Sequence, residues 1–151
     1  MKGYKIGLSK VDDNGDSRLC YALIELEIPE NYPGLKCYSF GSMNRSNVAR
    51  VLNINKLVVA WGPFYEPTAR VTLEYLDSAF SLFDPNFYYH PGELVYPDRF
   101  EDKMFMCANG IHFFTNRQQA IDYTMNNWVL SRFTDCTLEL LINELNSNKR
   151  Y

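Results

Sequence analysis

The sequence lacks several features that would place it in a familiar functional class. It has no basic run or stripe and its formal net charge is −3, which argues against nucleic acid as a partner. No apolar segment reaches the roughly 18 residues that a membrane-spanning helix needs. The first residues, 1–4, lack the apolar core of a signal peptide. We therefore expect a protein without a membrane span that is intracellular and not secreted.

Cysteine and histidine do not occur in a metal-binding pattern. The four cysteines, Cys20, Cys37, Cys107 and Cys136, are far apart and none forms a C-x-x-C pair. No histidine stands at zinc-ligand spacing from them. The sequence therefore predicts no metal site and no cofactor, and thiols that are mostly buried and free.

Aromatic residues, in contrast, are abundant. The 151 residues include ten Phe, eleven Tyr and two Trp, and neither a repeat nor a linker divides them. A chain of this length fits a single domain, 1–151, because it can bury roughly 70% of its unfolded surface. Aromatic side chains fill cores, but they also dominate the energetics of protein–protein interfaces. Some tyrosines could therefore contact a partner, although the edge of the core explains any one of them more simply.

Alternating apolar residues predict that most of the chain forms strands. Residues 4–11 and 19–28 flank a strong turn and predict an antiparallel hairpin. Shorter strands are expected at 35–40, 48–54, 57–61, 69–76, 87–89 and 93–96. In residues 69–76, Val71, Leu73 and Tyr75 are expected to face inward, although a short helix fits equally well. Residues 44–47 predict a polar turn.

The stretch from Cys107 to Tyr123, C-A-N-G-I-H-F-F-T-N-R-Q-Q-A-I-D-Y, predicts a turn, a strand, a cap and a helix in succession. Asn109-Gly110 is typical of a turn, and residues 111–114 of a strand covered on both faces. Thr115 stands three residues before Gln118, which is the spacing of a capping box. The helix that follows has its apolar stripe at Ala120, Ile121, Met125 and Trp128. Since the strand leads directly into the helix, His112 and the first helical N–H groups would lie close together.

A second helix is expected over residues 134–146, where Leu138, Leu141, Ile142 and Leu145 recur at helical spacing. The predicted fold class is therefore α+β. It consists of an antiparallel, strongly curved sheet of about six to eight short strands, with two helices near the C-terminus. The second of these helices is expected to pack on the domain.

The candidate binding residues gather around this strand and its turn: Cys107, Asn109, His112, Thr115 and Tyr89. Cys107 and His112 could form a nucleophile–base pair across the turn. No third group is available to orient the imidazole, however, and a buried thiol and a core histidine are the simpler interpretations. We therefore predict no catalytic residues.

Residues 83–123 contain F-D-P-N-F, P-G-E and C-A-N-G-I-H-F-F. They resemble an uncharacterised domain of nucleocytoplasmic large DNA viruses, which has Y-D-P-x-F in the first of these motifs and in some proteins accompanies pentapeptide repeats. The segments A-L-I-E-L-E-I-P and R-S-N-V-A-R-V-L-N-I are similar more loosely, with Asn44, Arg45 and Asn47 where members often carry Cys, Arg and Lys. The resemblance brings no established activity. It implies a viral protein, located in the virion or in the host cytoplasm of an infected cell.

Gly110 to Tyr123 is also similar to ADP-ribosyltransferases of the poly-ADP-ribose type, in which a G-I-Y-F strand precedes a helix ending in A-N-Y. That similarity would make His112 a stacking partner for nicotinamide, but the upstream His-Gly pair and an assignable catalytic Glu are missing. Two hypotheses remain. The first is a non-catalytic structural or protein-interaction protein, such as a minor capsid component, whose partners are coat proteins or a second copy. The second is a NAD- or nucleotide-binding protein with its site around His112.

Overall fold

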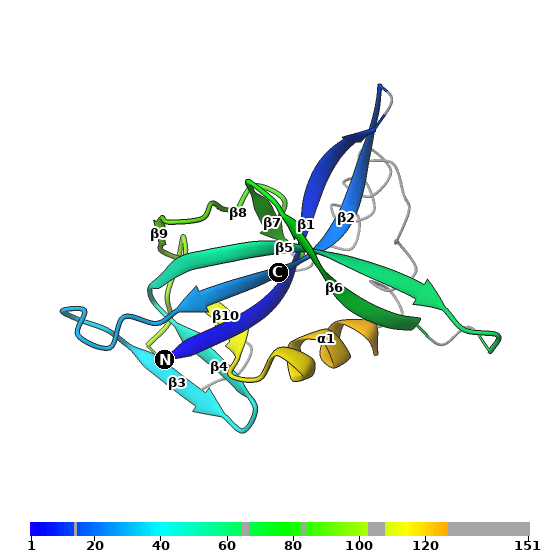
Figure 1. Cartoon of the computed structure of the whole chain (residues 1–151). Coiled ribbons are helices and arrows are strands. Elements are labelled where there is room, and N and C mark those ends of the chain that lie inside the picture. The colour runs from blue at the N-terminus through cyan, green and yellow to red at the C-terminus, as the bar shows by residue number, and fades with distance from the viewer. Residues whose placement is uncertain (14, 65–66, 83, 103–107, 127–151) are drawn as a thin grey trace.

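The computed structural model describes residues 1–13, 15–64, 67–82, 84–102 and 108–126, which form one ten-stranded sheet and one helix (Figure 1). In chain order, the elements are β1 (Lys2–Asp13), β2 (Asp16–Glu27), β3 (Cys37–Phe40), β4 (Met43–Ser46), β5 (Ala49–Trp61), β6 (Pro67–Tyr75), β7 (Ala79–Ser81), β8 (Tyr88–Tyr89), β9 (Leu94–Val95), β10 (Ile111–Phe114) and α1 (Arg117–Met125). The expected helix at 134–146 lies outside the described residues, as do Cys107, Cys136 and Trp128. Within the described ranges, no helix is long and apolar enough to cross a membrane.

The sheet is antiparallel and curled, as predicted, with the strand order β3-β4-β10-β1-β2-β5-β6. Its frame is the hairpin of β1 and β2, which stay in register from Lys2 opposite Glu27 to Asp13 opposite Asp16. β5 is one continuous strand where two were expected, because the intervening Lys56 still pairs with Ala22 of β2. Alternating apolar residues along these long strands give the sheet two apolar faces.

The curl of the sheet allows both of these faces to be covered. On one face, α1 packs on β1, β10 and β6, and its Ala120, Ile121 and Met125 join the core there. On the other face, the segment that includes β7, β8 and β9 packs on β2 and β5 through Ala79, Tyr89 and Val95. Figure 1 shows α1 on one side of the sheet, following directly from β10. Residues of β1, β10, α1 and the 81–101 segment line one common space.

Residues 44–46 form a strand, so the prediction of a polar turn there is wrong. Asn44, Arg45 and Ser46 lie in β4 and pair with β10 on one side and β3 on the other. All three are buried, Arg45 and Ser46 completely. Asn44 and Ser46 form hydrogen bonds with neighbouring residues in the sequence, whereas Arg45 donates to carbonyl oxygens of distant segments, which a local pattern does not reveal.

β6 also differs from its prediction, in the direction of two side chains. Residues 72–74 lie opposite the single residue Lys56, a bulge fixed by the hydroxyl of Thr72, which donates to the Lys56 carbonyl at 2.8 Å. After this bulge, Leu73 is 91% and Tyr75 68% exposed, whereas Val71 still packs on the core. Such a bulge in one strand redirects its side chains, so the inward placement of Leu73 and Tyr75 is wrong.

The helix cap is shifted by one residue from its predicted position. The side-chain oxygen of Asn116 accepts a hydrogen bond from the backbone N–H of Gln119 at 3.1 Å. Asn116 has extended backbone angles and fills the N-cap position. The capping box predicted for Thr115 and Gln118 is therefore wrong, and Thr115 is an exposed residue between β10 and α1.

Candidate functional site

The sheet forks at β1. β10 pairs with one edge of β1 at Tyr4, and β7 pairs with the same edge at Gly7 and Leu8. Lys5 and Ile6 lie between these two strands and have no ladder partner on that edge within the described sheet. β10 turns away to pair with β4, so the two branches separate as they leave β1.

A glycine permits the close approach of one branch. A Cβ at Gly7 would lie 2.7 Å from the carbonyl oxygen of Phe80 in β7, closer than real Cβ atoms come to other atoms. β7 can therefore lie against β1 only where the side chain is a hydrogen. This contact sets one side of the fork.

The fork opens into a cleft of about 880 Å³, which we call the fork cleft. It lies between β1, β10, the 81–101 segment and the part of α1 that includes Ala120, Tyr123 and Thr124. Its aromatic lining consists of Phe87, Tyr89, Phe114 and Tyr123. Its ionisable lining consists of Lys5, Asp84, Asp98, Arg99, Glu101 and His112. A cleft of this size falls within the range of known ligand sites, roughly 300–1,000 Å³.

The structure brings together three of the five predicted binding residues. Tyr89, Asn109 and His112 all line the fork cleft, although they come from segments up to 23 residues apart in sequence (112 − 89). Thr115 does not line it, and Cys107 lies outside the described residues. The strand assignment of Ile111 to Phe114 is confirmed, and His112 is half-buried within it.

Three of the charged groups in the fork cleft, Lys5, Asp84 and Glu101, have defined partners. Lys5 Nζ donates to the hydroxyl of Tyr89 at 2.8 Å and lies 5.0 Å from the centre of that ring. Glu101 Oε1 accepts from Asn109 Nδ2 at 2.8 Å. Asp84 Oδ1 accepts from the backbone N–H of the residue two positions later at 3.0 Å. The fork cleft therefore has charges of both signs around an aromatic floor.

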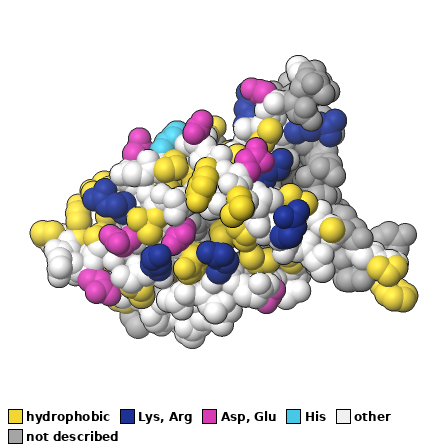
Figure 2. Space-filling model, in the orientation of Figure 1, with side chains coloured by type: hydrophobic (Ala, Val, Ile, Leu, Met, Phe, Trp, Pro, Cys, Tyr) yellow, Lys and Arg dark blue, Asp and Glu magenta, His cyan; other side chains and the backbone are white. Residues whose placement is uncertain are grey.

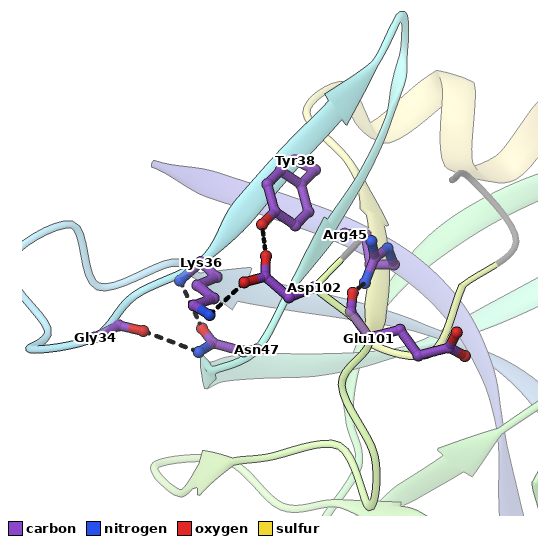
Figure 3. Close-up of polar contacts among 7 residues, drawn as sticks. All are labelled: Gly34, Lys36, Tyr38, Arg45, Asn47, Glu101 and Asp102. Atoms are coloured by element: carbon purple, nitrogen blue, oxygen red, sulfur yellow. Dashed lines mark hydrogen bonds and ion pairs between the residues drawn. The ribbon is translucent and has the colours of Figure 1, made fainter. Parts of the chain in front are cut away.

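One wall of the cleft is fixed by Arg45, which is not among the predicted binding residues. Its Nη1 donates to the carbonyl oxygens of Glu101 at 2.7 Å and Asn109 at 2.8 Å, and so holds the two sides of this wall together. The guanidinium carbon lies 4.8 Å from the centre of the Phe100 ring and 5.2 Å from that of Tyr38. Arg45 and the Glu101 backbone face one another in Figure 3. No local signal identifies this residue, because its hydrogen-bond partners are 56 and 64 positions away.

A surface cluster attaches the same wall to β3. Lys36 Nζ lies 2.6 Å from Asp102 Oδ2, and the Tyr38 hydroxyl donates to Asp102 Oδ1 (Figure 3). The hydrogen bonds from Lys36 and then Tyr38 lower the pKa of Asp102 below its ordinary value. The same bonds raise the pKa of Lys36 and of Tyr38. All three groups face water, so they position the wall but add little to the stability of the fold.

Comparison with known proteins gives a family but no activity. Residues 1–120 match a family described as "Family of unknown function (DUF5758)". No curated protein matches the sequence, and no solved structure matches it. The matched range includes every strand that the structure describes and the start of α1, and therefore most of the lining of the fork cleft.

Proposed function

Since the chain belongs to this family of unknown function, DUF5758, we propose from the geometry of the fork cleft that it is a non-catalytic protein-interaction protein. In this proposal the cleft accommodates a short segment of a partner protein. The observation that carries the proposal is the fork itself. It combines an aromatic floor, charges of both signs and a stretch of β1, Lys5–Ile6, without a ladder partner on that edge in the described sheet.

The lining of the cleft suits a peptide. Phe114 and Tyr123 form a tilted pair with ring centres 5.3 Å apart, and Tyr123 is half-exposed. Aromatic side chains in partly enclosed positions are typical anchors at protein interfaces. A polypeptide also supplies N–H and C=O groups, which can pair with an unpaired stretch of strand such as residues 5–6.

The distribution of charge also favours a protein partner. Figure 2 shows Lys and Arg side chains interspersed with Asp and Glu on the face it displays, with hydrophobic side chains between them. A surface with both signs mixed does not attract a polyanion such as nucleic acid strongly. It suits a partner that also has mixed charges.

We extend the proposal to the setting in which the protein acts. On the resemblance of residues 83–123 to the domain of large DNA viruses, the protein acts in the virion, as a minor capsid component, or in the cytoplasm of an infected cell. Coat proteins or a second copy are then the expected partners. Mass spectrometry of purified virus particles tests this part, because a minor component is found at constant stoichiometry across preparations. A protein that is lost as the particles are purified is not a component of the virion.

Site-specific photocrosslinking tests the interaction itself. A photoreactive phenylalanine analogue is placed at position 123, which lines the fork cleft, or at position 96, which does not. The two positions are matched, because Tyr123 is 49% and Tyr96 51% exposed. We expect a discrete protein adduct from position 123 alone in extracts of cells that contain the protein. The same adducts from both positions, or none from position 123, would contradict the proposal.

The second candidate is a NAD- or nucleotide-binding protein. It is favoured by one observation: Tyr123, which matches the final Tyr of the ADP-ribosyltransferase pattern, and His112, which stands where that family has Tyr, both line the fork cleft. Thermal unfolding with NAD tests it, since a ligand at 100 times its Kd adds about 2.7 kcal/mol to the free energy of unfolding. A rise in Tm that His112→Ala abolishes would support this candidate, whereas an unchanged Tm would exclude it for NAD.

A further inference from the structure

We propose that Lys5 and Tyr89 form an anchor for a carboxylate group of the bound peptide. The inference depends on the proposed interaction function and specifies the chemistry of the ligand. It starts from the hydrogen bond of 2.8 Å between Lys5 Nζ and the Tyr89 hydroxyl inside the fork cleft.

Lys5 differs from the other lysines that the structure describes. Lys2, Lys36 and Lys56 each form an ion pair with a carboxylate, and Lys10 is exposed to water. Lys5 is half-buried, and within the described part of the chain no carboxylate oxygen lies within 4.0 Å of its Nζ. Its hydrogen-bond acceptor there is the neutral hydroxyl of Tyr89. A partly buried ammonium group is stabilised when an anion completes its environment.

Two kinds of donor converge at this point. An ammonium group has three N–H donors, and the Tyr89 hydroxyl accepts one of them. The oxygen of Tyr89 acts as the acceptor in this bond, so its own O–H is left to donate. Tyr89 is only 1% exposed, which holds the hydroxyl in place. One carboxylate can therefore receive an N–H from Lys5 and the O–H from Tyr89.

The neighbouring acidic residues explain why the anion is a carboxylate. Asp84 and Glu101 line the same cleft and already accept hydrogen bonds from backbone or amide groups. Their negative charges would repel a doubly charged phosphate more strongly than a singly charged carboxylate. The site therefore favours an Asp or Glu side chain, or a C-terminal carboxylate, since these share one chemistry.

Three short peptides separate these sources. Ac-Phe-Glu-Phe-NH₂ has an internal carboxylate, Ac-Phe-Gln-Phe-OH a terminal one, and Ac-Phe-Gln-Phe-NH₂ none. Each is titrated into protein labelled with ¹³C-lysine and ¹³C-aromatic residues, and the Lys5 Cε–Hε signal is assigned with Lys5→Arg. We expect a carboxylate peptide to shift the Lys5 signal saturably and to bind about tenfold more tightly than the neutral peptide. The carboxylate peptide that binds more tightly identifies the source.

Two variants complete the test. Lys5→Gln should weaken binding of that peptide about tenfold, whereas Lys10→Gln on the exposed part of the same strand should not. Equal affinity for the neutral peptide, or unchanged affinity in Lys5→Gln, would overturn the carboxylate anchor. In that case shifts of Phe114 and Tyr123 would still support a peptide site. If no peptide shifts these aromatic signals either, both the anchor and the proposed function fail.

Discussion

Replacing Arg45 by methionine should destabilise the protein by about 3 kcal/mol. The guanidinium donates two hydrogen bonds to carbonyl oxygens, and each such bond from a charged donor contributes about 1.5–3 kcal/mol. Its contacts with the rings of Tyr38 and Phe100 add about 0.5–2 kcal/mol. Against these gains, the wild type keeps a fully buried cation out of water, which costs several kcal/mol. Methionine fills a similar volume but restores neither hydrogen bond.

Urea unfolding followed by circular dichroism measures this loss as a shift of the midpoint at constant slope. Arg45→Lys should recover only part of the loss, because an ammonium group cannot stack on the two rings while reaching both carbonyls. Arg70→Met, which removes an exposed arginine from the edge strand β6, is the matched control and should stay within about 0.5 kcal/mol of wild type. A loss below about 1 kcal/mol for Arg45→Met would refute the idea that this residue holds the wall of the fork cleft.

Three further outcomes follow from the same structure. Gly110→Ala should lower the free energy of unfolding, measured in urea, by about 1–3 kcal/mol. The reason is that a Cβ at position 110 would lie 2.6 Å from Cγ of Arg45. A variant as stable as the wild type would contradict this packing. Asp102 has a pKa below its ordinary value of 3.8. Its stabilising contribution is therefore present above that pH and is lost as the pH falls through the lowered pKa. An NMR titration should show this midpoint, and Asp102→Asn should remove that part of the pH dependence. Phe113→Ala should lower the free energy of unfolding by about 3–5 kcal/mol, because the Phe113 side chain is 0% exposed. Leu73→Ala should lower it by less than about 0.5 kcal/mol, because Leu73 is 91% exposed. Similar losses for the two variants would contradict the bulge in β6.

The frame of the sheet could be predicted because its signals are local. Strict alternation in residues 19–28 and the turn before them were enough to identify the β1–β2 hairpin. The apolar run Ile111–Phe114 likewise marked a covered strand. In contrast, β4 was missed because its buried polar residues have the composition of a turn. The bulge in β6 depends on a hydrogen bond to another strand, so alternation alone misplaced two side chains.

The candidate site could be predicted in part for the same reason. Asn109 and His112 could be predicted because they lie in a recognisable turn and in the strand that follows it. Lys5 and Arg45 did not, although Lys5 lines the fork cleft and Arg45 fixes its wall. Each has its role through a partner at least 56 positions away in the sequence. Such a role depends on how the strands are arranged in the fold, so it cannot be predicted from a short sequence motif.

The residue at position 7 sets the width of the fork cleft, although it does not line the cleft itself. Gly7 does not belong to the lining, yet the approach of β7 to β1 depends on its having no side chain. An alanine there would push one branch outward and leave every ligand-facing group chemically unchanged. Under the proposed function, relatives that differ at this one position would bind peptides of different width with the same set of contacts.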